Sequence, residues 1–301
     1  MSNVLGRGEK FFQVIIHIFL IFFTLCAILP LWVLVAGSIT GEKELILQGY
    51  SFFPKSISIA AYKYLFYKAA DILNAYGITL FITVVGTVVS LVITPLLAYP
   101  LSRQDFQRRN LVSFFVFFTM LFNGGIVPSY IMWTQIFHMK NTIWALILPG
   151  LLMNGFNVIL MRNYFSQNIP VELIEASKID GAGEFKIFME IILPLSLPIM
   201  ATIGLFVGIG YWNDWTNGLY YVTRPNLYSL QNLLNRILQD VQFLSSSTVS
   251  QASGGNAAMT EMPSVSIRMA ISVVGILPIL VLYPFFQKYF VKGITVGAVK
   301  G

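Results

Sequence analysis

Hydrophobic residues are gathered into six long blocks, separated by more polar segments. The blocks run near 13–36, 77–100, 112–136, 142–161, 195–218 and 269–287. Each is close to the ~20 apolar residues that a helix needs to cross a bilayer. A membrane β-barrel would instead show alternating segments of about ten residues. Because lipid offers no partner to backbone polar groups, the pattern predicts an all-α integral membrane protein with six transmembrane helices.

The composition agrees with a lipid environment. Hydrophobic residues make up 56% of the 301-residue chain and charged residues 11%, whereas a soluble domain has about 25% charged residues. The first block follows Arg7 and Lys10, as the apolar region of a signal peptide would, but that region is only about 7–15 residues long. We therefore expect a retained first helix. The net charge of +6 is scattered along the chain, which argues against nucleic acid as a partner.

The basic residues predict an orientation, because short cytoplasmic loops are enriched in Lys and Arg. If the N-terminus is cytoplasmic, the short outer loop between the third and fourth helices carries only Lys140. The cytoplasmic segments then contain Arg103, Arg108, Arg109, Arg162, Lys178, Lys186, Lys288, Lys292 and Lys300. The sequence thus predicts a multi-pass protein of the cell (inner) membrane with both termini in the cytoplasm.

Two longer segments, 37–75 and 219–268, fall outside the membrane in this topology. The aromatic stretch 62–66 predicts a short helix at the membrane interface. An amphipathic helix is predicted in the second segment from apolar residues at helical spacing, which are Leu230, Leu233, Leu234, Ile237, Leu238 and Val241.

The segment 170–194 predicts two short helices on the cytoplasmic side. Pro170 suits the first turn of a helix, and Asp180-Gly181 suits a turn that ends one. Apolar residues of the second helix are expected on one side, and Pro194 then begins the fifth transmembrane helix; these apolar residues are Phe185, Phe188, Met189 and Ile192. From these residues alone, a docking element for a soluble partner and a surface or re-entrant helix covering the bundle remain equally possible.

The spacing of seven residues in this segment resembles the EAA loop of binding-protein-dependent ABC importers. That pattern is Glu-Ala-Ala, three residues, Gly, nine residues, Ile, one residue and Leu-Pro. It matches here at Glu175, Ala176, Ser177, Gly181, Ile191, Leu193 and Pro194, with Ser177 in place of alanine as the one departure. The resemblance implies that the first helix of this EAA loop (residues 170–194) docks on an ATPase subunit, with Glu175 facing the ATPase and Gly181 making the bend.

Other parts of the chain extend the resemblance. Residues 288–301 are similar to the tail of carbohydrate-type permeases related to the maltose transporter, and 121–125 and 211–215 look like the branch that imports complex oligosaccharides. In that family the tail reaches between the two ATPase subunits. The tail residues expected at the ATPases are Gln287, Lys292, Gly293 and Lys300.

The resemblance implies a single permease domain over 1–301 that translocates a sugar or oligosaccharide. Its implied partners are a second homologous permease subunit, two cytoplasmic ABC ATPases and an extracytoplasmic sugar-binding protein. The chain has no G-x-x-x-x-G-K-[ST] motif to cradle ATP phosphates. We therefore expect no cofactor and no enzymatic activity in this chain, with ATP and Mg²⁺ bound by the partner ATPases. His17 and His138 are isolated from other ligand types, so no metal site is expected.

Polar and aromatic residues within the blocks are candidates for a substrate pathway, because polar groups at membrane depth usually face the bundle interior. The third helix is expected to be kinked or broken at Asn123, and Asn154 and Asn157 should share one face of the fourth helix. The full set is Asn123, Asn154, Asn157, Trp212, Asn213, Asp214 and Trp215. Interhelical hydrogen bonds and an interfacial aromatic belt are the alternative roles for these side chains.

Three other function classes make different predictions for the sequence. An ion-coupled secondary transporter would show ionisable pairs near the midplane and inverted repeats, and neither is clear. A membrane-embedded enzyme needs a nucleophile and base, or metal ligands, on facing helices, whereas the centres of the blocks lack Asp, Glu, Lys and Arg. A permease for another small solute stays open, because the tail favours sugars only by analogy.

Overall fold

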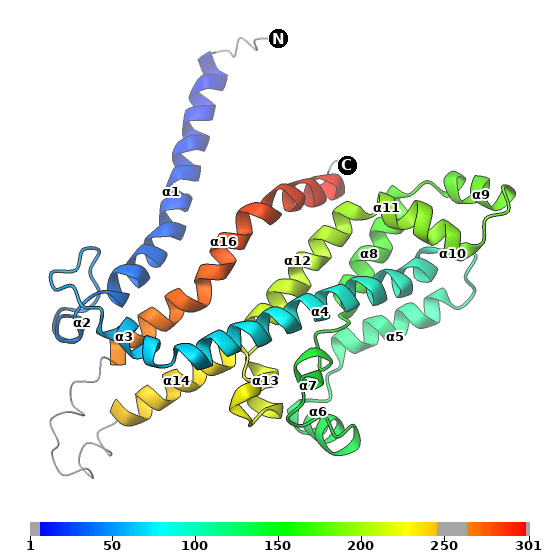
Figure 1. Ribbon diagram of the computed structural model, residues 1–301. Coiled ribbons are helices and arrows are strands. Elements are labelled where there is room, and N and C mark those ends of the chain that lie inside the picture. The colour runs from blue at the N-terminus through cyan, green and yellow to red at the C-terminus, as the bar shows by residue number, and fades with distance from the viewer. Residues whose placement is uncertain (1–6, 246–263, 299–301) are drawn as a thin grey trace. The chain divides into compact units, whose positions relative to one another are not determined.

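The computed structural model describes residues 7–245 and 264–298 and is helical almost throughout. Within these residues the one β-bridge pairs Thr40 with Ile57. Figure 1 shows these helices along the chain. The chain divides into two compact units. Unit 1 comprises Met1–Ala69 and Arg236–Pro278, and unit 2 comprises Ala70–Asn235 and Ile279–Gly301.

Unit 1 contains α1 (Arg7–Ser38), α2 (Glu42–Gln48), α3 (Ala60–Tyr67) and the start of α16 (Ser264–Ala298). The apolar stretch of α1, Phe11–Ser38, buries almost none of its side chains, as expected of a helix that faces lipid on all sides. The Glu42 carboxylate accepts hydrogen bonds from the backbone N–H groups of Val265 (2.8 Å) and Ser266 (3.0 Å). It therefore caps the orphan donors at the start of α16. The sequence prediction missed α2, which carries Glu42.

Unit 2 holds most of the remaining helices. Its segments are α4 (Ala69–Ser102), α5 (Arg109–Leu121), α6 (Ile126–Ile131), η1 (Met132–Ile136), α7 (Trp144–Ile147), α8 (Gly155–Asn168), α9 (Val171–Ile179), α10 (Glu184–Ile187), η2 (Phe188–Ile192), α11 (Leu193–Leu195), α12 (Leu197–Asn213), α13 (Thr216–Tyr221), η3 (Pro225–Leu227) and the start of α14 (Leu230–Ser245). Both η1 and η2 are π-helical turns.

The described residues contain two continuous helices long and apolar enough to cross a membrane, Phe11–Ser38 and Ala69–Ser102. These confirm the first two predicted spans. Two further apolar helix pairs are bent: Arg109–Leu121 meets Ile126–Ile136 at 110°, and Glu184–Leu195 meets Leu197–Asn213 at 78°. The first break lies at Asn123, where the sequence predicts it. Counting each bent pair as one span gives up to four.

The predicted helix over 142–161 is wrong as a continuous element. The structure splits it into α7 and α8, and α8 continues to Asn168. Pro149-Gly150 lies between them, with Gly150 in the left-handed region (φ +73°). Proline and left-handed glycine both interrupt helices. A prediction from hydrophobicity alone does not detect this break. The block 195–218 is likewise shorter as a helix, since α12 ends at Asn213, and the block 269–287 lies inside α16.

The amphipathic helix predicted within 219–268 is confirmed as α14 (Leu230–Ser245). Five of the six residues predicted for its apolar face are buried, and Leu238 is partly buried. The buried residues are Leu230, Leu233, Leu234, Ile237 and Val241. The short helix predicted at 62–66 is present as α3, and its place at the membrane interface stays a prediction. Residues 246–263 of the second outer segment lie outside the described part of the chain.

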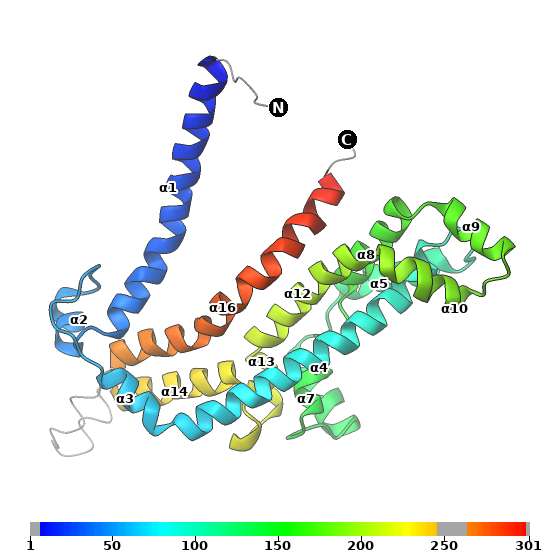
Figure 2. The same cartoon turned by 45° about the horizontal axis from the view of Figure 1, so that its top comes forward.

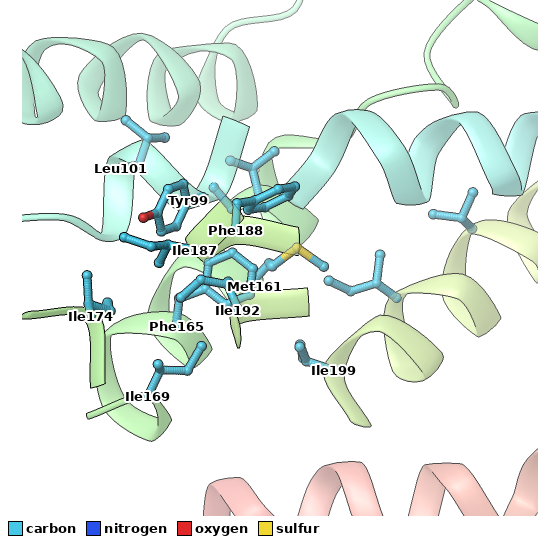
Figure 3. Packing of buried hydrophobic residues seen from close by; sticks show 14 of the residues in the cluster. Tyr99, Leu101, Met161, Phe165, Ile169, Ile174, Ile187, Phe188, Ile192 and Ile199 are labelled. Carbon is cyan, nitrogen blue, oxygen red and sulfur yellow. The ribbon is translucent and has the colours of Figure 1, made fainter. Parts of the chain in front are cut away.

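One hydrophobic cluster of unit 2 joins the end of α4 to α8, α9, α10, η2 and α12 (Figure 3). Its members include Tyr99, Leu101, Met161, Phe165, Ile169, Ile174, Ile187, Phe188, Ile192 and Ile199. A second cluster packs Ile82 of α4 against Leu146, Ile147 and Val222. Figures 1 and 2 both show α9 and α10 at the end of unit 2 where α4 finishes and α5 begins. The first cluster therefore fixes the EAA loop to that end of the unit.

Candidate functional site

The first helix of the EAA loop, α9, is attached through a single deeply buried side chain. Ile174 is 5% exposed and belongs to the cluster of Figure 3. Pro170 adopts an extended conformation and directly precedes the helix. The sequence predicts it one residue later, in the first helical turn. Glu172 lies in the first turn, where a negative charge is favourable. Because Ile174 is the one buried residue of α9, the other side chains of this helix are exposed or partly exposed.

Gly181 ends α9 in a Schellman motif. Its φ of +79° is left-handed, its N–H donates to the Lys178 carbonyl (3.0 Å), and the Ala182 N–H donates to the Ser177 carbonyl (2.9 Å). These two bonds satisfy carbonyls that the helix end would leave unpaired. A side chain at residue 181 would be strained whatever the space around it. The predicted glycine turn is thus present and has a specific backbone cause.

The EAA residues Glu175 and Ala176 are exposed on α9. Ser177, the one departure from the motif, donates its hydroxyl to the Leu173 carbonyl (2.7 Å). This bond to the preceding turn keeps the hydroxyl satisfied inside the helix. The substitution of serine for alanine therefore leaves the helix geometry intact.

The second helix of the loop corrects one expectation. Phe188 and Ile192 are buried, but Phe185 is 71% and Met189 is 48% exposed. The two buried side chains are four residues apart, as are the two exposed ones, so the buried side of this helix is narrower than the sequence predicts. Residues 188–192 form the π-helical turn η2. This turn directly precedes Pro194 in α11, whose missing N–H and bulky ring disfavour a regular α-helical turn.

Of the last three EAA residues, Ile191 and Leu193 are partly buried against the cluster, and Pro194 is exposed. Between α9 and α10 lies a small open pocket of about 160 Å³. Its lining is Ser177, Asp180, Ala182, Lys186, Ile187, Glu190 and Ile191. Of the seven motif residues, Ser177 and Ile191 line this pocket.

A polar network of five residues connects this loop to the end of α4; its members are Tyr99, Arg103, Asp105, Lys178 and Glu184. The Tyr99 hydroxyl donates to Glu184 Oε2 (2.6 Å), and Lys178 Nζ lies 2.7 Å from Glu184 Oε1. Lys178 also lies 3.3 Å from Asp105 Oδ2. Arg103 donates two hydrogen bonds to Asp105, from Nε at 3.1 Å and Nη2 at 2.7 Å.

This network holds its groups in their charged forms. The hydrogen bond from Arg103 is the main cause that lowers the pKa of Asp105 to about 2. The hydrogen bond to Glu184 is the main cause that raises the pKa of Lys178. Opposite charges and hydrogen bonds to an ionised group both favour ionisation.

The end of α4 is also held from α8. Arg162 Nε donates to the Leu101 carbonyl (3.2 Å), and Ser166 Oγ donates to the Ser102 carbonyl (3.4 Å). These are carbonyls of the last helical turn, which need partners from outside the helix. In the sequence, Arg162 and Lys178 indicate only the topology, and their spacing gives no sign that Arg162 meets α4 or that Lys178 meets Glu184.

Three of the substrate-pathway candidates cap local structure. Asn123 Oδ1 accepts from the Gly125 N–H (2.8 Å) in the break after α5. Asn154 Oδ1 accepts from the Phe156 N–H (2.8 Å) and caps α8. Asp214 Oδ1 accepts from the Thr216 N–H (3.1 Å) and hydroxyl (2.7 Å) at the start of α13. These are the positions where short polar side chains are preferred.

The expected shared face for Asn154 and Asn157 is therefore wrong, because Asn154 precedes the helix that carries Asn157. Asn157 is buried within α8. At the end of α12, Trp212 is 7% exposed with its ring 6.3 Å from that of Tyr76, which does not fit a lipid-facing belt. Asn213 and Trp215 are exposed. Among the described residues, Trp212 Nε1 and Asp214 Oδ2 are buried and have no hydrogen-bond partner.

The tail candidates Gln287, Lys292 and Gly293 lie on α16, whose helix continues to Ala298. Lys300 lies outside the described residues.

The apolar helices, the bent helix pairs and the exposed two-helix loop define an all-helical membrane protein. The sequence profile of the binding-protein-dependent transport system inner membrane component family matches residues 75–296. The chain belongs to this family. It is accordingly an inner-membrane permease component of an ABC transporter, which works with a binding protein and ATPases, and it is not the catalytic subunit.

Individual relatives cover almost the whole chain. The chain is 42% identical to Protein LplC of Bacillus subtilis (strain 168), over 91% of this chain and 90% of the relative. It is 38% identical to the polygalacturonan/rhamnogalacturonan transport system permease protein YtcP of the same organism, over 97% and 99%. A solved bacterial ABC transporter involved in the import of the acidic polysaccharide alginate contains a similar chain, with a TM-score of 0.76, 30% identity, and coverage of 96% and 100%.

Proposed function

We propose that this permease carries an oligosaccharide across the membrane and that its EAA loop receives the movement of a cytoplasmic ATPase. In this proposal the chain crosses the membrane six times, with both termini in the cytoplasm. Segments 219–268 and 288–301 are its outer loop and its cytoplasmic tail. A second homologous permease completes the membrane part, two ABC ATPases bind ATP and Mg²⁺, and an extracytoplasmic sugar-binding protein delivers the cargo.

The observation that carries the proposal is the combination of exposure and attachment in the EAA loop. Ile179 is 87% exposed and Phe185 is 71% exposed, so large apolar side chains point away from the unit. Ile174 and Ile187 of the same loop are 5% and 0% exposed, and they pack into the cluster that includes α4, α8 and α12. An apolar outer surface fits a protein partner, and the buried side transmits its displacement to the helices.

The cargo assignment is supported by the relatives. One is named for polygalacturonan and rhamnogalacturonan transport, another for arabinooligosaccharides (30% identical over 93% of this chain), and the similar solved transporter imports alginate. Trp212 and Asp214 are the pathway residues that fit best, because each has a buried polar atom without a hydrogen-bond partner in the described structure. Asn157, Asn213 and Trp215 are further candidates, and the last two adjoin Trp212 and Asp214 in the sequence.

The test uses the complete transporter, reconstituted in liposomes with its binding protein. ATP hydrolysis is measured with oligogalacturonides, alginate oligosaccharides and arabino-oligosaccharides in parallel. We expect stimulation by at least one of these saccharides and none by amino acids. Stimulation by an amino acid, with no response to any saccharide, would contradict the proposed cargo class.

A further inference from the structure

Three segments of the chain meet at one carboxylate. Glu184 opens α10, Lys178 lies in the last turn of α9, and Tyr99 lies near the end of α4. Both oxygens of Glu184 are used, since Oε1 pairs with Lys178 and Oε2 accepts from the Tyr99 hydroxyl. Lys178 and Glu184 flank Gly181, so their ion pair closes across the bend of the EAA loop. The Tyr99 bond attaches this closed bend to α4.

A second path leads from the loop to the same helix. Lys178 forms an ion pair with Asp105, and Asp105 accepts two hydrogen bonds from Arg103. Arg103 directly follows the last residue of α4. The Arg103 side chain is only 15% exposed. A two-bond contact between guanidinium and carboxylate is more directional than a single ion pair. The loop is thus connected to α4 at two points, one before and one after the helix end.

Apolar burial already holds the loop in place, through Ile174, Ile187 and the contact of Phe188 with the Tyr99 ring at 5.4 Å. The side chains of Asp105, Lys178 and Glu184 are 58%, 40% and 54% exposed, and exposed ion pairs contribute little to stability. The polar network instead restricts the orientation of the loop relative to α4. Hydrogen bonds weaken steeply when the distance or angle changes, whereas apolar side chains tolerate sliding.

We infer that Tyr99, Lys178 and Glu184 are positioning residues that make α4 move together with the EAA loop. The inference rests on the proposed function of that loop. When the loop is displaced by the ATPase, the network keeps the bend closed and transfers the displacement to the end of α4. Without it, the loop slides over its apolar seat and less of the movement reaches the helix.

The experiment measures the distance between α4 and the loop in the complete reconstituted transporter. Cys26 is the only cysteine, so Cys26→Ser gives a background for two spin labels, at Leu96→Cys on α4 and Gly183→Cys in the loop. Leu96 is exposed, and Gly183 has an ordinary φ of −71° with open space where a side chain would begin. Distances are recorded by pulsed electron paramagnetic resonance without nucleotide and after trapping with ATP, Mg²⁺ and vanadate.

With the native network, we expect the same narrow distance distribution in both states. Tyr99→Phe keeps the ring against Phe188 but removes the hydroxyl, and Glu184→Gln keeps the size but removes the charge. Each should shift or broaden the trapped distribution. The double variant should change the distributions by less than the sum of the two single variants, because both substitutions weaken the contact between Tyr99 and Glu184. The matched control is Lys186→Gln with Glu190→Gln, an exposed pair at 4.0 Å within one helical segment, which should leave both distributions unchanged.

Wild-type distributions in both states for Tyr99→Phe and for Glu184→Gln would overturn the inference. Additive effects of the two substitutions would also contradict it, since independent contacts would then be at work. The proposed function is tested separately by contact between α9 and the ATPase. If that contact is found while the network variants keep wild-type distances, only the positioning role falls.

Discussion

The backbone N–H of Ala182 donates to the carbonyl oxygen of Ser177 at 2.9 Å, across the left-handed Gly181. This one bond turns the chain back at the end of α9 and sets where α10 begins. We propose that α9 binds the ATPase and that the buried side chains of the EAA loop transmit its movement to the hydrophobic cluster of Figure 3. The geometry of the bend is then a requirement for coupling rather than for folding.

Gly181→Val is expected to lower uptake strongly while the protein still inserts in the membrane. A β-branched residue at φ +79° is strained by about 1–3 kcal/mol, and the loop would relieve that strain by opening the bend. Gly183→Ala is the control, because Gly183 has a negative φ and room for a methyl group. Uptake into proteoliposomes and ATP hydrolysis are measured together. Normal uptake by Gly181→Val would contradict the role of the bend.

Gly86→Ala is expected to lower the free energy of unfolding by about 1–3 kcal/mol. The Tyr211 ring lies directly over Gly86, so an added methyl group would collide with it, and the Tyr211 hydroxyl is tied to the Ile147 carbonyl (2.7 Å). Gly77→Ala on the same helix meets open space and should instead stabilise by about 0.5–1 kcal/mol. Thermal unfolding of the detergent-solubilised protein distinguishes the two. Equal shifts would show that the α4–α12 contact is looser than described.

Asn141→Ala is expected to destabilise the loop between η1 and α7 by about 1–3 kcal/mol. Asn141 has a left-handed φ of +59°, and its Oδ1 accepts from the N–H groups of Thr223 (2.6 Å) and Arg224 (3.2 Å). Asn141→Gly loses the same hydrogen bonds without the backbone strain, so it should be the milder variant. Limited proteolysis of this loop provides the measurement. Equal protection of both variants and the native protein would rule out the anchoring role.

The polar network is expected to be insensitive to pH from about pH 5 to about pH 9. The pKa of Asp105 is lowered to about 2, so its stabilising contribution is complete above the unfolded value and is lost only as the pH falls toward about 2. The pKa of Lys178 is raised, so its contribution is complete below the unfolded value and is lost at higher pH. The unfolding temperature of the native protein relative to Asp105→Asn should be constant over this window. A difference that changes near neutral pH would contradict this charge assignment.

The sequence predicted the membrane class, the first two spans and the bend at Gly181, because each depends on local signals. Hydropathy indicates the length of an apolar helix, and a glycine that follows a helical pattern predicts a left-handed turn. It failed where a local breaker lay within an apolar block, as at Pro149-Gly150. It also failed for the second helix of the loop, where Phe185 is exposed although Phe188, three residues later, is buried.

The candidate site was only partly accessible from sequence. The EAA residues were found through their spacing, and their roles stay proposals. The contact between Tyr99 and Glu184 joins residues 85 positions apart, and no pattern in one sequence pairs them. Asn123, Asn154 and Asp214 were singled out because polar groups are rare in apolar blocks. The structure supplies the competing physical reason for their presence, since each caps a turn or helix start.

Cross-linking from α9 to the ATPase tests the central claim most directly. In the Cys26→Ser background, Glu175→Cys or Ile179→Cys carries a short photoactivatable cross-linker in the assembled transporter, with and without ATP. We expect a product with the ATPase subunit from both positions, and a yield that changes with nucleotide. Cross-links only to lipid or to this chain, in every nucleotide state, would contradict the account.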